Sequence, residues 1–165
     1  MNFKLDLYGE VNEDMVQYVA QSFRENYSKD CTIEVALDSV GGYIESANDI
    51  AEILVAAMQD GSTVIAYNTG NVMSAATVIF LASTVRFFDP EAGDFVIHQP
   101  SMYSEGTADE ILQAAVGLVQ TEEFLVNLYS NFSDTPKETI LEIMKEDRAL
   151  TPEEIEMLGL ARIVE

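Results

Sequence analysis

The segment IEVALDSVGGYIESANDI, residues 33–50, decides the fold class. Its first five residues, 33–37, are predicted to form a strand, and Asp38 to Gly42 form a turn with two adjacent glycines. From Ile44 to Met58, apolar residues recur at the spacing of one helix face. A strand that passes through a tight turn into a helix is the repeating unit of α/β proteins.

The rest of the chain repeats this alternation. Apolar patterning predicts strands at 3–8, 63–67, 85–88, 95–97 and 161–164, with the 63–67 strand buried on both sides. It predicts helices at 11–27, 107–131, 136–145 and 151–159, with Asn12 and Thr151 as N-caps. The run Val72 to Leu81 fits either a strand or a helix, although its small residues favour a helix start. We therefore predict one α/β domain over residues 1–165 with a largely parallel sheet.

Composition limits the classes of function. The chain has 165 residues, of which 48% are hydrophobic, and carries 29 acidic against 8 basic residues. Such a charge repels phosphate backbones and anionic lipid, so neither nucleic acid nor a membrane is an expected partner. No apolar run reaches the length of a membrane span, and nothing in the sequence directs export, so we expect a cytoplasmic protein.

The chain has one histidine and one cysteine. This pair is too few for a metal site rich in nitrogen or sulfur ligands, and we expect neither a metal nor a cofactor. Cys31 leads into a predicted strand, which favours a structural thiol over a nucleophile.

Three features carry chemistry. The paired glycines at 41 and 42 would let backbone amides point at a developing oxyanion, although a purely structural turn is the commoner use of such a pair. Ser74 lies in the strand–turn–helix segment GNVMSAA, residues 70–76, where small neighbours leave room for a substrate; the alternative is a packing or capping hydroxyl. The elbow pattern G-x-S-x-G is absent.

The third feature is His98, in the apolar stretch FVIHQP, residues 95–100. A lone histidine after a strand is usually structural. A serine nucleophile, however, needs a base within hydrogen-bond reach, and His98 is the side chain suited to that role at neutral pH. A carboxylate would orient its other nitrogen, and 29 acidic residues leave that choice open.

The order of these segments resembles the Clp protease proteolytic subunit family, ClpP. The matching segments are the Asp38–Gly42 turn, Gly70 to Ala75, Ile97 to Pro100, Asp147 to Leu160, and the opening Leu7 to Val11. The resemblance runs over nearly the whole chain and implies a ClpP/crotonase-like fold of repeated β-β-α-type units with a protruding handle helix, the handle region covering about 101–135.

The resemblance also implies a function. It implies a serine endopeptidase acting through an acyl-enzyme, with Ser74 as nucleophile, His98 as base and then acid, Asp147 as the orienting carboxylate, and the amides of Gly42 and Ala75 as oxyanion hole. It further implies a homo-oligomer, a heptameric ring or double ring, that takes peptide or unfolded protein. We expect the apolar faces of the 44–58 and 107–131 helices to be shared between subunits.

The chain departs from the family in three places. Val40 stands where the family has proline, Gly106 is the one glycine between Pro100 and the next helix, and the sequence begins almost at the first strand. We therefore expect a short, acidic member without the N-terminal axial-loop segment, for which an AAA+ unfoldase is a candidate partner only. The alternatives are a non-catalytic or partner-activated ring subunit and a crotonase-superfamily acyl-CoA enzyme.

Overall fold

The computed structural model describes residues 2–164, which form two compact units. The first unit comprises residues 2–96 and 149–164, and the second comprises residues 97–148. The first carries every strand and the second carries two helices. That residues 1–165 act as one protease domain stays a prediction.

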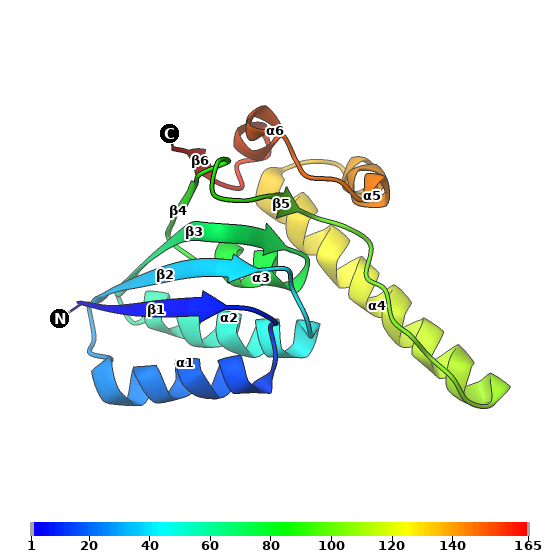
Figure 1. Cartoon of the computed structure of the whole chain (residues 1–165), viewed down its shortest axis with the longest axis horizontal. Coiled ribbons are helices and arrows are strands. Elements are labelled where there is room, and N and C mark those ends of the chain that lie inside the picture. The colour runs from blue at the N-terminus through cyan, green and yellow to red at the C-terminus, as the bar shows by residue number, and fades with distance from the viewer. Residues whose placement is uncertain (1, 165) are drawn as a thin grey trace. The chain divides into compact units, whose positions relative to one another are not determined.

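The first unit is a six-stranded parallel sheet with helices packed on it (Figure 1). The sheet order is β1-β2-β3-β4-β6, and β5 pairs with β3 beyond the end of β4. The strands are β1 Asn2–Tyr8, β2 Thr32–Ser39, β3 Thr63–Met73, β4 Val85–Phe88, β5 Phe95–Val96 and β6 Arg162–Ile163. Its helices are α1 Glu13–Asn26, α2 Ile44–Gln59, α3 Ala75–Leu81 and α6 Pro152–Met157. The predicted α/β class with a parallel sheet is confirmed.

Both predicted helix starts in this unit are confirmed. The Asn12 side chain accepts a hydrogen bond from the Met15 amide at 3.1 Å. Thr151 and Glu154 form a capping box, with Pro152 in the first turn of α6. Such caps satisfy amides that have no partner within the helix.

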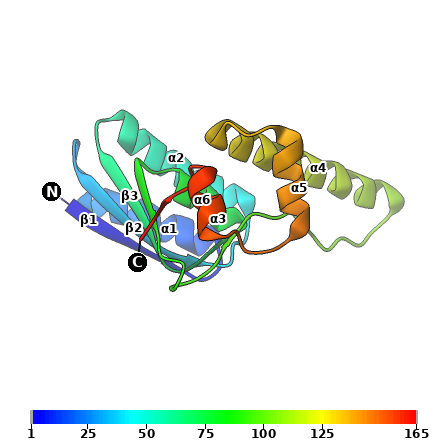
Figure 2. The same cartoon turned by 90° about the horizontal axis from the view of Figure 1, so that it is seen from above.

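Helices α1 and α2 lie side by side against one face of the sheet (Figures 1 and 2). On this face the strands contribute fully buried apolar side chains, among them Leu5, Ile33 and Val35. Among the alternating residues, Lys4 of β1 and Glu34 of β2 are exposed, whereas Ala36 at the middle of β2 is buried. This alternation is what a sheet with one covered face requires.

Strand β3 differs from its prediction in length and in burial. It continues to Met73, six residues beyond the predicted end, and Ser74 then joins it to α3. The run from Val72 to Leu81 is therefore a strand end followed by a helix. Ile65 and Tyr67 are only half-buried, so the prediction of a strand buried on both sides is wrong.

The expectation that α2 shares its apolar face with another subunit stays a prediction, although the single chain already covers much of that face. Ala47, Ile50 and Leu54 are fully buried within the single chain, where α2 packs against α1, α3 and β3. The periodicity identifies the apolar face correctly, but the chain's own elements cover it.

The second unit is a helical hairpin of α4 Ala108–Ser133 and α5 Lys137–Glu146, which pack on each other. Residues 101–113 are exposed throughout. Along the first two-thirds of α4, an unusual number of large apolar side chains face solvent. These are Ile111, Leu112, Val116, Val119 and Phe124. Within residues 2–164, no helix has the length and apolar character needed to cross a membrane.

Candidate active site

Ser74 occupies the sharp turn between β3 and α3 in the first unit. Its backbone has φ 53° and ψ −127°, a combination that serine rarely adopts. Its amide donates to the Val96 carbonyl of β5 at 3.0 Å, and its carbonyl accepts from the Thr77 amide at 2.9 Å. Both backbone groups are thus fixed, and a strand-to-helix turn of this strained kind presents its side chain outward, as a nucleophile requires.

A set of polar side chains holds the end of β3 that leads to Ser74. The Asp38 carboxylate accepts from the Asn71 amide at 2.9 Å, and the Asn71 side chain accepts from the Asp94 amide at 3.0 Å. The Asn68 side chain accepts a hydrogen bond from the Asp89 amide at 2.7 Å and donates one to the Gly70 carbonyl at 3.0 Å. It therefore links β3 to the loop between β4 and β5. These bonds let the strand continue through polar residues and fix the position of the serine turn.

Asp38 was predicted as the first residue of the turn, but it lies in strand β2. It explains why residue 70 is glycine, since a Cβ on Gly70 would collide with the Asp38 carboxylate. Sequence reasoning missed this role because nothing distinguishes Asp38 from the many other acidic residues. The adjacent Gly70 is the one local signal that could have indicated it.

The first of the paired glycines, Gly41, lies directly against the serine turn. Gly41 has φ 101°, and a Cβ on it would lie 2.7 Å from the Ser74 Cβ and 3.2 Å from the Ala75 nitrogen. The backbone bridge to Val11 engages the Gly41 carbonyl and the Tyr43 amide, so the intervening Gly42 amide is not used by this bridge. Ala75 is the first residue of α3, where an amide has no partner within the helix. Ala75 therefore adjoins Ser74, whereas Gly42 is linked to the serine turn only through its neighbour Gly41, and a Cβ on Gly42 would meet Val11 instead.

His98 and Asp147 come together in the second unit. His98 Nδ1 lies 3.7 Å from Asp147 Oδ1, and the two side chains are 27% and 73% exposed. Asp147 is the C-cap of α5 and has a left-handed backbone conformation with φ 47°. The distance is longer than a hydrogen bond, as is common at catalytic pairs without substrate.

The predicted site residues therefore fall into two groups. Ser74, Ala75 and Gly42 belong to the first unit, and His98 and Asp147 are paired in the second.

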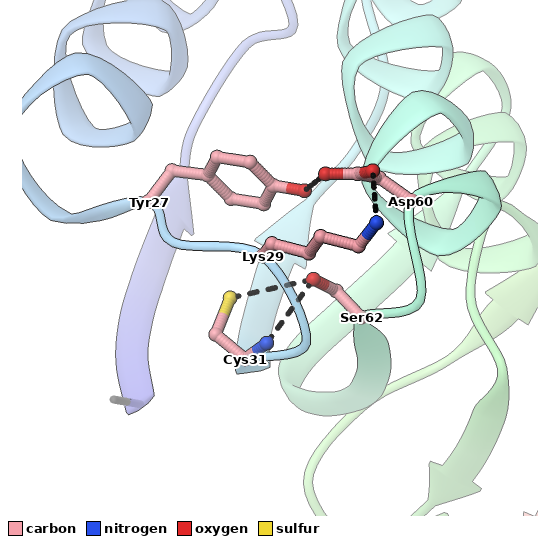
Figure 3. Close-up of polar contacts among 5 residues, drawn as sticks. All are labelled: Tyr27, Lys29, Cys31, Asp60 and Ser62. Atoms are coloured by element: carbon pink, nitrogen blue, oxygen red, sulfur yellow. Dashed lines mark hydrogen bonds and ion pairs between the residues drawn. The ribbon is translucent and has the colours of Figure 1, made fainter.

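Cys31 lies elsewhere in the first unit and has a structural environment (Figure 3). It is 2% exposed, and its Sγ lies 3.6 Å from the Ser62 hydroxyl, which also accepts from the Cys31 amide. Beside it Asp60 accepts from the Tyr27 hydroxyl at 3.0 Å and pairs with Lys29 at 3.5 Å. These contacts tie the start of β2 to the end of α2, which supports the structural alternative for the thiol. Among the described residues, no group of three or more His, Cys, Asp or Glu is arranged to hold a metal ion.

The fold and the serine turn define a class, that of α/β proteins with a serine at a strained strand-to-helix turn. Comparison with known proteins identifies the family. Residues 2–165 match the family model for Clp protease, and the chain belongs to the Clp protease family.

Individual relatives agree with this assignment. The chain is 30% identical over 162 residues to ATP-dependent Clp protease proteolytic subunit 3 of Rhizobium etli, covering 96% of this chain and 81% of that protein. The identity is 28%, with the same coverage, to the subunit 3 of Rhizobium meliloti. Among solved structures, a ClpP1 point mutant from Listeria monocytogenes superposes with a TM-score of 0.82 at 26% identity, covering 98% of this chain and 91% of that one. The predicted family and fold are confirmed, and membership supports a ClpP-like serine protease.

Proposed function

We propose that the chain is a serine peptidase that hydrolyses peptide bonds with Ser74, His98 and Asp147. The observation that carries the proposal is the backbone of Ser74, held at φ 53° with Gly41 against it in a member of the Clp protease family. An acyl-CoA enzyme of the crotonase type is not favoured, because it would have no need for a paired serine and histidine.

In the proposed reaction, Ser74 Oγ attacks the scissile carbonyl carbon and His98 Nε2 takes its proton. The carbonyl oxygen becomes an oxyanion, and the amides of Gly42 and Ala75 donate hydrogen bonds to it. His98 then gives the proton to the leaving amine, which breaks the carbon–nitrogen bond and leaves an acyl-enzyme. Water, activated by His98, releases the acid and restores Ser74. Asp147 on Nδ1 keeps Nε2 free to accept the proton.

The proposal includes assembly into a homo-oligomeric ring, heptameric and either single or double. Support comes from the family and from α4, whose exposed Leu112 and Val116 are 64% and 51% accessible in the single chain. Apolar side chains repeated along a helix are stabilised by burial against another copy. Peptide or unfolded protein is the proposed substrate, and an AAA+ unfoldase is the proposed partner.

A second candidate is a ring subunit that is inactive alone and acts only with a partner. The 3.7 Å separation between His98 and Asp147, with Asp147 mostly exposed, is the observation that favours it. Such a subunit would assemble without hydrolysing peptides until a partner aligns the pair.

Hydrolysis of fluorogenic peptides by matched serine variants tests the proposal. Ser74→Ala and His98→Ala should each lower kcat by roughly 10³-fold or more while leaving the oligomer intact on gel filtration. Ser104→Ala, an exposed serine in the second unit, is the control and should retain full activity. Normal turnover by either of the first two variants would remove the triad from consideration.

A further inference from the structure

The second unit contains a pocket directly after His98 in the chain. It has a volume of about 230 Å³ and lies between α4 and the segment that follows β5. Its lining residues are Gln99, Pro100, Leu118, Val119 and Glu122. Pro100, Leu118 and Val119 make an apolar wall, and Gln99 and Glu122 supply its polar atoms.

The polar end of this pocket accepts hydrogen bonds. Gln99 Nε2 donates to Glu122 Oε2 at 2.6 Å, which occupies one carboxylate oxygen and one amide hydrogen. The other carboxylate oxygen and the amide oxygen of Gln99 remain as acceptors. Glu122 is half-buried, and among residues 2–164 no lysine, arginine or histidine forms an ion pair with it. A carboxylate in such a position is stabilised by an incoming cation.

The pocket is fixed next to the proposed base by the chain itself. Gln99 follows His98, and its amide donates to the Met144 carbonyl at the end of α5, at 3.3 Å. Consecutive Cα atoms lie only about 3.8 Å apart, so the Gln99 end of the pocket is joined directly to His98.

We propose that this pocket is a specificity subsite for a long basic side chain, lysine or arginine, of the peptide substrate; the proposal rests on the peptidase function proposed above. The aliphatic stem would lie along Leu118 and Val119, and the charged end would reach Glu122 and the Gln99 amide oxygen. The net charge of −21 acts in the same direction, because it raises the local concentration of basic peptides.

Two fluorogenic peptides that differ only by lysine or norleucine at one position test the subsite. The lysine peptide should have the higher kcat/KM, and Glu122→Gln should lower the lysine-to-norleucine ratio about tenfold, as loss of one charge-assisted hydrogen bond predicts. Glu123→Gln is the matched control, since it removes an exposed neighbouring charge outside the pocket. An equal ratio in the native and Glu122→Gln proteins, or an equal fall in both variants, would overturn the subsite.

Binding without turnover separates this proposal from the proposed function. Fluorescence anisotropy with the Ser74→Ala protein should show tighter binding of the labelled lysine peptide than of the norleucine peptide. Adding Glu122→Gln should remove that difference. If this preference is found but the native protein hydrolyses neither peptide, the subsite stands and the peptidase function fails. If both peptides are hydrolysed or bound equally well, the subsite fails; absence of all binding overturns it too.

Discussion

Ser74 has a backbone conformation that a serine keeps only when its surroundings fix it. Strain of this kind costs of the order of 1–3 kcal/mol and concentrates at functional turns. Here the amide bond to Val96, the carbonyl bond from Thr77 and the close approach of Gly41 hold it in place. The proposed nucleophile is therefore positioned before substrate arrives, which is where much of the catalytic advantage of such a site originates.

The close approach of Gly41 to Ser74 can be tested by comparing an alanine variant of Gly41 with one of Gly9. Gly9 and Gly41 both have positive φ, 83° and 101°, but a Cβ on Gly9 meets nothing within 4 Å. Gly9→Ala should therefore cost about 1 kcal/mol of unfolding free energy, with kcat/KM unchanged. Gly41→Ala should lower both stability and kcat/KM, the latter by roughly 100-fold, because its Cβ displaces the serine turn.

Urea unfolding and peptide kinetics on the same preparations measure the two effects separately. Equal kcat/KM values for the two glycine variants would contradict a role of Gly41 in holding Ser74.

At the residue level, sequence reasoning could reach the paired glycines, Ser74 and His98, because each belongs to a short recognisable segment. Asp147 came only with the family resemblance, since a carboxylate gives no local signal among 29 acidic residues. Asp38 was missed for the same reason. Its contact with Asn71 joins residues 33 positions apart, and no local pattern reports such a bond.

At the level of elements, strands and helices with clear periodicity could be predicted to within a few residues. The end of β3 could not, because Asn68, Thr69, Gly70 and Asn71 have the composition of a turn. The strand continues through them because the Asp38 side chain of β2 accepts from the Asn71 amide, and because the side chains of Asn68 and Asn71 bond the backbone of Asp89 and Asp94, which is a tertiary effect. The burial of α2 by its own chain is likewise decided by packing and not by periodicity.

The start of α4 supplies a prediction about pH. Glu110 accepts from the Thr107 amide at 2.7 Å and from its hydroxyl at 2.8 Å. Both bonds lower the pKa of Glu110 from its ordinary value of 4.5, and the bond from the backbone amide has the larger effect. A carboxyl with a depressed folded-state pKa stabilises the helix start above the ordinary pKa, and this contribution is lost as pH falls through the depressed value.

Glu110→Gln should therefore weaken the first turn of α4 at neutral pH and remove this pH dependence. Carbon-13 chemical shifts of residues 108–111, followed as the pH is lowered past 4.5, measure the helicity directly. Asp109→Asn is the control and should keep the transition, because Asp109 takes no part in the capping box. The same titration curve in Glu110→Gln and the native protein would contradict the assignment.

At the level of the whole molecule, two properties oppose each other. A net charge of −21 makes copies repel, while the apolar residues along α4 favour association. At 0.1 M, salt screens the charge repulsion beyond about 10 Å and leaves the association of the apolar side chains intact. Association should therefore strengthen as ionic strength rises.

A single charge on the exposed α4 surface should break the oligomer. Leu112 is 64% exposed in the isolated chain, and Leu112→Asp places a carboxylate where we propose that copies meet. Multi-angle light scattering should show smaller species for this variant, and the native oligomer for Gln113→Asp, which adds the same charge one position along the helix. A native protein that stays monomeric at micromolar concentration in about 0.5 M salt, where charge repulsion is screened, would contradict the ring.

The measurement that tests the central claim most directly is labelling with a fluorophosphonate probe, followed by mass spectrometric mapping of the adduct. The probe reacts with serines that are activated by a neighbouring base. We expect one adduct, on Ser74, that is lost in His98→Ala and retained in Ser104→Ala. An adduct on a different serine, or labelling of Ser74 at the same rate without His98, would contradict the claim that His98 activates Ser74.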